Sequence, residues 1–585
     1  MRRYKQIFVI YSKYIYDIKI ITVSIMNSSE ITKILESLKI SPNNISDKKE
    51  AEAFRILLKI IEQLNMEVNA LKAELQKTRD ELNMLKGEKG QPKIPISKQK
   101  PSDFSSEKER KSLDSPSEKK SKEKLSKIKI DFTEVCLVDK SILPEDAIFK
   151  DYDPVVVQDI IITTKNTLYM KEVYYSPSQH KTYTGELPKG VEGEFGYGVK
   201  SLIITLKHAS NVSEPKIHEF LVNLGIHISP ATISRILTKN NELFHQEKAD
   251  IFKAGLESTI YQQIDDTGAK VKGQNHYVQI ICNPFYTAYF TIPHKDRLSI
   301  LDILQGGKTR TYFFNDEAFT LLKYFRLSKK MIFKLRTAVF DKKLDEKQMH
   351  QLMEEIFSNP GKGINQRTRI MEAGAIAAYH NQKEFPVVKA LLSDAAPQFK
   401  KLTEEQALCW IHDGRDYTKL VPVVPLHKKE LEDFRSQYWN YYGKLLKFKQ
   451  DMSQENAEKL SAEFDELVST ETNYEAMNKL IKKTKEIKSE LLLTLKYPEI
   501  PLHNNAAELG ARSQVRKRDV SLHTMTEEGT KANDTFSTIV QTAKKLGVSA
   551  YEYFNDRVSK SFKMPSLAEL IGAKKSSTFT FKDNG

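Results

Sequence analysis

The chain has 585 residues, far more than one hydrophobic core usually organises, so several domains are expected. Lysine and arginine number 91 against 77 aspartates and glutamates, and the resulting net charge of +14 suits a polyanionic partner, although lysine-rich soluble proteins also carry such a surplus. The three cysteines, Cys136, Cys282 and Cys409, lie far apart and are odd in number, which excludes a disulfide framework and indicates a reducing compartment.

The first 25 residues begin like a secretory signal, but Lys13, Asp17 and Lys19 interrupt the apolar stretch. No run approaches the ~18 apolar residues that a membrane-spanning helix needs, so no membrane partner is expected. Met26 opens a more ordinary start, MNSSEITKILESL, and the leader is then either genuine or translated upstream sequence. We assign residues 1–47 to a leader and a short N-terminal helix.

Two rows of mostly apolar residues repeat at seven-residue intervals along residues 48–86. The rows are Phe54, Ile61, Val68, Leu75 and Leu82, and Leu57, Leu64, Leu71, Thr78 and Leu85. β-Branched residues in the first row and leucines in the second favour a parallel two-stranded coiled coil, and so a homodimer or higher oligomer. The alternative is a single amphipathic helix that packs on its own core.

Residues 87–129 are dominated by Lys, Ser, Glu, Pro and Gln. Such a stretch cannot bury enough apolar surface to offset its ordering entropy, so a basic, flexible linker is expected. Residues 130–195 then contain VVVQDIIITT and TLYMKEVYY, two apolar stretches separated by Lys165 and Asn166. They predict short strands and turns in a small β-rich module.

Residues 196–245 are predicted to contain two helices joined by a turn. Residues 212–224 have helical apolar spacing, Gly225 follows, and Ser229 and Pro230 suit the N-cap and first position of a second helix. This order is typical of a helix-turn-helix, whose second helix enters the DNA major groove, but an ordinary helical hairpin has the same pattern. The polar face of the second helix would present Thr232, Ser234, Arg235 and Lys239.

Acidic residues follow or end several predicted strands. Three consecutive strands are expected over residues 259–292, and the first ends in Asp265 and Asp266 with a turn at Gly268. Further on, VVKALLSDAAPQF predicts an apolar strand ending in Asp394, followed by a helix-like stretch.

A third acid, Glu508, lies on a helix predicted to begin near Asn504 or Asn505. Carboxylates on a first strand, at the end of a later strand and on a following helix have the layout of a ribonuclease-H-like site. Such carboxylates must converge to bind hard cations through oxygen, and two metals held there activate the attacking oxygen and stabilise the leaving oxygen at phosphorus. Taken singly each acid is weak evidence, because most Asp and Glu residues are solvated surface groups.

Four segments resemble the DDE transposases of the bacterial insertion-sequence-66 family. They are IDDTGAKVKGQNHYVQIICNP, LLSDAAPQF, LCWIHDGRDY and HNNAAELGARSQVRKRDVS. The likeness runs from about Gly193 to Arg557, and the NNAAE segment with its basic continuation is its most specific part. The predicted helix-turn-helix and the N-terminal heptads are also similar to those of the family.

The resemblance implies a catalytic, metal-binding triad of Asp265, Asp394 and Glu508, with Asp266 as a neighbour of the site. It implies two divalent ions, Mg²⁺ or Mn²⁺, and a cytoplasmic, nucleoid-associated protein. Transposon-end and target DNA would be its partners, with possible accessory transposition proteins. Its activity would be phosphodiester hydrolysis at terminal inverted repeats, which frees a 3′-OH, and strand transfer of that end.

The sequence departs from the family pattern in two places. The family's cysteine-rich zinc module has no counterpart, because residues 130–195 hold only Cys136, so no zinc is expected. Asp265 and Asp394 are also separated by a long stretch of chain, and the apparently helical residues 314–385 within it are interpreted as an insertion into the core.

Cys409 and His412 resemble a Cys-x-x-His signature of related transposases. Two ligands are too few for structural zinc, so the resemblance implies a buried positioning role, with an inert strand end as the alternative.

The helix that carries Glu508 is basic beyond the acid. Arg512 and Arg516 fall on roughly its face and would neutralise a DNA phosphate, unless Arg512 only pairs with Glu508 inside the helix. Arg516, Lys517 and Arg518 form a cluster expected to touch backbone phosphates without reading sequence.

The expected fold is multidomain α+β, with an N-terminal coiled coil, a helix-turn-helix and a ribonuclease-H-like α/β catalytic core. The core would span residues 255–313 and 386–530 around the helical insertion, and C-terminal helices and a tail would span 531–585. Two other functions fit less well. A catalytically inactive, transposase-derived DNA-binding protein would more often have lost one acid, and a ribonuclease-H-like nuclease has little use for the helix-turn-helix and coiled coil.

Overall fold

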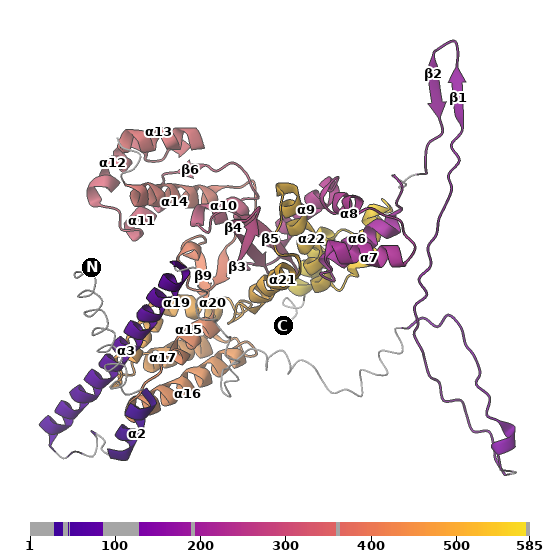
Figure 1. Cartoon of the computed structure of the whole chain (residues 1–585). Coiled ribbons are helices and arrows are strands. Elements are labelled where there is room, and N and C mark those ends of the chain that lie inside the picture. Colours follow the sequence, from indigo (N-terminus) through magenta and orange to yellow (C-terminus); the bar gives the residue numbers. More distant parts are fainter. Residues whose placement is uncertain are drawn as a thin grey trace, which may run out of the picture. The chain divides into compact units, whose positions relative to one another are not determined.

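The structure is a computed structural model that describes residues 28–38, 42, 45, 47–85, 128–144, 146–188, 193–357 and 363–580 (Figure 1). The predicted leader and almost all of the predicted linker lie outside the described residues. The chain divides into two compact units. The first unit is drawn from Met1–Phe104, Ile260–Asp265 and Asp296–Asn504, and the second from Ser105–Thr259, Asp266–Lys295 and Asn505–Gly585. Along the described residues, no helix combines the length and apolar character that a membrane crossing requires.

A large core of the first unit surrounds Trp410 in a bundle of helices. These are α15 (Trp410–Thr418), α16 (Pro425–Phe448), α17 (Gln454–Leu467), α18 (Glu475–Glu486), α19 (Lys488–Leu491) and α20 (Leu493–Lys496). The indole is fully buried, contacts the rings of Tyr438 and Phe464, and donates from Nε1 to the Leu491 carbonyl at 2.8 Å. Apolar burial of this size and a satisfied indole N–H fix the bundle.

The N-terminal helices α2 (Ser28–Leu38) and α3 (Lys48–Leu85) belong to the first unit, beside the start of α16 (Figure 1). Leu58 packs on Val423 and Val424, and the buried Glu62 carboxylate accepts from the N–H groups of these two valines at 2.9 and 3.1 Å. The first turns of α3 therefore pack as an amphipathic helix on the chain's own core, which is the alternative to a coiled coil given above.

The rest of α3 presents a different face. Leu57, Leu64, Leu71, Leu75 and Leu82 are all about half exposed or more. The long helix is confirmed, whereas the second strand of a coiled coil stays a prediction.

Five strands form a sheet in the order β5-β4-β3-β8-β9. They are β3 (Tyr261–Val271), β4 (Gln274–Cys282), β5 (Thr287–Ile292), β8 (Ala390–Ser393) and β9 (Glu405–Leu408). β4 pairs antiparallel with β5, while β8 pairs parallel with both β3 and β9. The start of β3 belongs to the first unit and its continuation from Asp266 to the second.

The first predicted strand is longer than expected. β3 continues past the acidic pair through Gly268, and the hairpin turns instead at Lys272 and Gly273, which have φ of +51° and +79°. A two-residue hairpin loop needs positive φ at both positions, which suits glycine and is tolerated here by lysine. The expected turn at Gly268 is therefore wrong.

The predicted helical insertion is mainly helical in the first unit. Its elements are α11 (Asp316–Tyr324), α12 (Lys329–Val339), α13 (Glu346–Ile356), α14 (Ile364–Asn381) and the short strands β6 (Tyr312–Phe313) and β7 (Lys343–Leu344). Arg297, in α10 (Arg297–Leu304), pairs with Glu372 of α14 and donates to the carbonyls of Pro397 and Lys400 at 2.7 and 2.9 Å. This buried guanidinium ties the insertion to the loop that follows Asp394.

The second unit contains most of the remaining helices. They are α6 (Tyr197–His208), α7 (Glu214–Asn223), α8 (Pro230–Thr238), α9 (Glu242–Ser258), α21 (Asn505–Ser521), α22 (Glu527–Leu546), α23 (Ala550–Val558) and α24 (Leu567–Thr580). α22 lies along β5 and α9 (Figure 1). The two helices predicted over residues 212–237 are confirmed as α7 and α8, and Ser229 caps α8 by accepting from the Thr232 N–H at 3.2 Å.

Residues 130–195 do not form the expected module. Among the described residues of this range, the strands are those of one hairpin, β1 (Val173–Ser176) and β2 (Lys181–Thr184), and residues 155–164 form no strand. Almost every described side chain from 147 to 188 is exposed. An apolar stretch becomes a strand only when a neighbouring strand takes its backbone groups and a core takes its side chains, and residues 155–164 have neither.

Lys517 corrects a prediction made for the basic cluster. Its side chain is buried, with Nζ 2.8 Å from His208 Nδ1 and 2.9 Å from Ser537 Oγ, so it joins α21 to α6 and α22. Burial, reinforced by Lys207, lowers the pKa of Lys517 to about 7. Lys517 was expected to contact phosphate, but it packs against α6 and α22 because it lies on the buried side of its helix.

We expect the substitution Lys517→Met to show a pH-dependent stability difference. The pKa is lower in the folded chain (about 7) than its ordinary value of 10.5, so the unfolded chain binds the proton more tightly and stability falls as pH falls from about 10 to 7. The midpoint of urea denaturation of the Met variant, relative to the wild type, should therefore be highest near pH 7 and decline toward pH 10. Arg516→Met, at the exposed neighbouring position, should show no such trend. A constant difference for Lys517→Met would contradict the burial of a cation.

Candidate catalytic site

Asp265 and Asp394 both lie in the first unit, two residues beyond the last paired residues of β3 and β8. The parallel register matches Tyr261 with Ala390 and Gln263 with Leu392. Continued two residues further, the same register places Asp265 opposite Asp394, which directly follows β8. Neighbouring strands lie about 4.8 Å apart and paired residues share a face, so this register sets two half-buried carboxylates side by side.

The Asp394 side chain is oriented by its own loop. Its Oδ1 accepts from the Ala396 N–H at 3.0 Å, and a single turn of 3-10 helix at Pro397–Phe399 follows in place of the expected helix-like stretch. When an aspartate side chain accepts a hydrogen bond from the backbone N–H two residues later, the chain forms a tight turn and the side chain loses rotamer freedom. Asp394 is therefore held at the end of its strand.

Asp266 has a different environment from Asp265. Successive residues of a strand point to opposite faces, and Asp266 forms an ion pair with Lys295 at 2.7 Å with its side chain only 8% exposed. Lys295 also lies over the ring of Tyr277, 6.0 Å from its centroid. The Asp266 charge is thus matched by a lysine, which leaves Asp265 as the acid beside Asp394.

Asn504 is a residue of the site that the sequence had offered only as a possible helix start. Its side chain is buried, and Nδ2 donates to the Ile264 carbonyl at 2.7 Å, immediately before Asp265. Its backbone N–H contacts Cys409 Sγ at 3.4 Å. The paired asparagines before AAE are the only signal in the sequence, and they do not say that the first one binds β3.

Cys409 lies where β9 ends. Its N–H donates to the Ser393 carbonyl at 3.1 Å, so it stands next to the residue that precedes Asp394, and it is the N-cap residue of α15. The buried thiol meets Asn504, and half-buried His412 lies one turn further along the chain. These contacts suit the predicted positioning role of Cys409, while the role of His412 stays a prediction.

Glu508 lies in the first turn of α21, in the second unit, and is half-buried. The expected helix start is confirmed, because α21 begins at Asn505, the residue after Asn504. The two aspartates thus lie within one unit, and the chain connects the anchored Asn504 to Glu508 through three residues.

The basic residues of α21 divide into three environments. Arg512 and Arg516 are exposed, Lys517 is buried as described, and the Arg518 guanidinium donates to the Gly268 carbonyl of β3. The predicted cluster is therefore smaller than its sequence suggests. Of the four basic residues, Arg512 and Arg516 have the exposed guanidinium groups that a phosphate contact needs.

The polar face of α8 is accessible. Arg235 is exposed and donates to the Thr232 hydroxyl at 2.9 Å, while Ser234 is half-buried. Ile233 and Leu237 of the same helix are buried, so its two faces are clearly distinct.

Comparison with known proteins gives two matches. The model of the Transposase IS66 family matches residues 373–532, which include Asp394 and Glu508. An uncharacterized protein, y4jO, of Sinorhizobium fredii (strain NBRC 101917 / NGR234) is 32% identical over 326 residues, which cover 55% of this chain and 99% of that relative. The chain matches nearly the whole of this relative and carries the family match, and it belongs to the IS66 transposase family.

Proposed function

We propose that the protein is an active DNA transposase whose catalytic acids are Asp265, Asp394 and Glu508. The observation that carries this proposal is the β3–β8 register, which sets Asp265 opposite Asp394 although the whole helical insertion lies between them in the chain. Two carboxylates that meet at adjacent strands repel each other, and a divalent cation bound between them would relieve that repulsion.

The sheet supports a ribonuclease-H-like core. Three consecutive strands, β3, β4 and β5, are followed after the insertion by β8 and β9, which extend the sheet from the other edge of β3 in parallel. In this arrangement the first acid lies on the central strand and the second directly after the next parallel strand. The third acid follows on a helix, which is the position of Glu508.

The donor set fits a hard divalent cation, because all three proposed ligands are carboxylates. Asn504 is bound to the backbone of β3, and Glu508 is four residues later, about 6 Å along a helix axis. Two Mg²⁺ or Mn²⁺ ions held by the three carboxylates would activate the attacking oxygen and stabilise the leaving oxygen of a phosphodiester.

The residues of the chain have distinct tasks in the proposed reaction. Asp265, Asp394 and Glu508 hold the cations, while Asn504 and Cys409 keep the strand ends and the helix start in register. Arg512 and Arg516 neutralise phosphate charge beside the cleaved bond. Water first displaces the 3′ oxygen at the transposon end, and the freed 3′-OH then attacks a target phosphodiester and releases one target strand end.

Recognition of the transposon ends is proposed for α8, and assembly for α3. Arg235 is exposed on a short helix capped by Ser229, which suits insertion into a major groove. The exposed leucine row of α3 suits pairing with a second copy of the chain, so that two protomers hold two ends. We place this work in the bacterial cytoplasm, on the nucleoid.

Substitution of the acids tests the catalytic proposal. Asp265→Asn, Asp394→Asn and Glu508→Gln should each lower Mg²⁺-dependent cleavage of transposon-end DNA by about 10²–10³-fold or more, since each removes one charge from the cation site. Binding of the same DNA, measured by mobility shift in EDTA, should be unchanged. Asp266→Asn is the matched control, because its carboxylate pairs with Lys295, and it should keep most of the activity.

Cleavage that survives in any of the three variants would remove that residue from the site. Loss of cleavage in Asp266→Asn with cleavage retained in Asp265→Asn would reverse the choice within the pair. A wild-type protein that binds the ends but never cuts them would favour the inactive DNA-binding protein.

Substitution of Arg235 tests recognition. Arg235→Ala should reduce the preference for end DNA over random DNA by about 1–3 kcal/mol, the worth of a bidentate contact with a base. Lys216→Ala, at an exposed position of α7 that pairs with Glu219, should leave that preference intact. Competition binding titrations at a fixed salt concentration give both values. An unchanged preference in Arg235→Ala would assign α8 to packing alone.

Substitution of the leucine row tests assembly. Leu64→Asp and Leu71→Asp together should convert the oligomer to a monomer, because each would bury an uncompensated charge in a paired seam. Glu67→Ala and Glu74→Ala, exposed on the same helix, form the control pair. Sedimentation velocity reports the oligomeric state. An oligomer that persists in the aspartate variant would place the main protomer contact elsewhere.

A further inference from the structure

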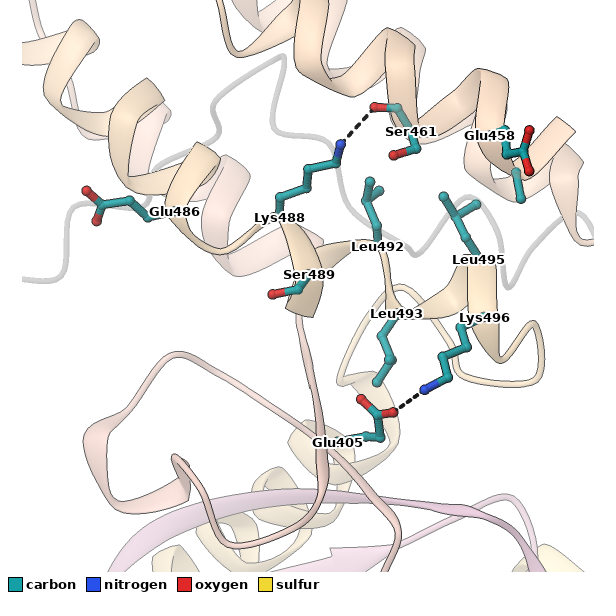
Figure 2. A pocket seen from close by; sticks show the side chains of 11 residues that line it. Glu405, Glu458, Ser461, Glu486, Lys488, Ser489, Leu492, Leu493, Leu495 and Lys496 are labelled. Atoms are coloured by element: carbon teal, nitrogen blue, oxygen red, sulfur yellow. Dashed lines mark hydrogen bonds and ion pairs between the residues drawn. The ribbon is translucent and has the colours of Figure 1, made fainter. Parts of the chain in front are cut away.

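Two cavities differ in what they offer an anionic ligand. The first, of about 700 Å³, lies among α17, α19 and α20, and both of its lysines already have acidic partners. Figure 2 shows Lys488 bonded to the Ser461 carbonyl and Lys496 paired with Glu405, and Lys488 also pairs with Asp465. With its cations neutralised, this cavity carries no argument for nucleic acid.

The second cavity, of about 650 Å³, lies in the second unit between the β3–β4 hairpin and the end of α21. Its lining includes Lys270, His276, Tyr277, Arg518 and His523, against the single acid Asp519. Within the part of the chain that the structure describes, no side-chain ion pair or hydrogen bond is found for Lys270 or His523. The cavity therefore has a lysine and a histidine still available to a ligand.

The walls of this cavity are joined by backbone hydrogen bonds. The Lys272 N–H donates to the Thr524 carbonyl at 2.8 Å, and Val271 forms an isolated bridge with Thr524. The Arg518 guanidinium also donates to the Gly268 carbonyl across the gap. A preformed cavity of this size falls in the range of about 300–1,000 Å³ that holds small ligands.

The cavity is lined in part by the strand that carries Asp266. Lys270 follows Asp266 by four residues of β3, roughly 13 Å along a strand. Tyr277, on the neighbouring strand, is linked back to Asp266 through Lys295. Because residues four apart on a strand share a face, Lys270 lies on the face of β3 that carries Asp266.

We propose that this cavity, named the hairpin pocket, binds an unpaired nucleotide of a DNA strand. Lys270 and His523 contact its phosphates and Tyr277 stacks on its base. The assignment rests on the proposed function and names a subsite for its DNA. Aromatic rings combined with cationic grooves are the means by which proteins hold single strands, whereas the base faces of a duplex are stacked inside and cannot enter a pocket.

The test uses the full-length protein in EDTA, so that cleavage is not required. Fluorescence anisotropy compares a short labelled oligo(dT) with a blunt duplex of random sequence. Tyr277→Leu should weaken oligo(dT) binding by at least about fivefold, as expected for loss of base stacking, and Tyr277→Phe should restore it to within about twofold. Both variants should bind the duplex like the wild type.

A matched pair of lysines tests the phosphate contact. Lys270→Gln should weaken oligo(dT) binding about threefold, whereas Lys272→Gln, exposed two residues further in the same hairpin, should change it by less than about twofold. Equal weakening of duplex and oligo(dT) by Tyr277→Leu, or no weakening of either, would overturn the hairpin pocket. A wild-type protein that never cleaves end DNA but shows the predicted Tyr277 dependence would overturn the catalytic proposal and leave the pocket standing.

Discussion

The parallel pairing of β3 with β8 is the constraint on which the rest of the first unit depends. It joins two segments that lie far apart in the chain, and the entropy of closing a loop grows only slowly with its length, so a long intervening segment is tolerated. The helices between the two strands fold as local structure, which shortens the effective loop. Once the register is set, Asp394, Cys409 and Asn504 take their positions by short backbone contacts to the same strand ends.

Buried polar side chains do the remaining alignment. Asn504 binds the backbone of β3, Glu62 binds the start of α16, and Lys517 joins His208 to Ser537. A buried polar group without a hydrogen-bond partner destabilises the fold. Alternative packings that would leave one of these side chains without its partner are therefore disfavoured. The core supplies most of the stability through apolar burial, and these residues select which helix meets which strand.

The sequence predicted helix starts well, because their signals lie within a few neighbouring residues. It predicted strand ends and buried faces less well, because these depend on residues far apart in the chain. Helix α8 could be predicted because Ser229 and Pro230 mark its start, and α21 because the NNAAE segment opens it. The turn at Lys272–Gly273 was missed because Gly268 lies nearer the acids, and nothing local shows that a strand continues through a glycine. Lys517 was misplaced because helical spacing gives the relative faces of residues but not which face packs inward. The proposal that Asp265 and Asp394 share a site came from family resemblance, whereas the register of β3 with β8 is a property of the folded chain.

The buried contacts of Arg297 have a consequence for how such proteins change over evolutionary time. Its guanidinium is satisfied partly by Glu372 of the insertion and partly by the carbonyls of Pro397 and Lys400. Replacement of Glu372 alone would leave a buried cation without its counter-charge, at a cost of several kcal/mol. Glu372 should therefore change less readily over evolutionary time than the exposed residues of the same helix.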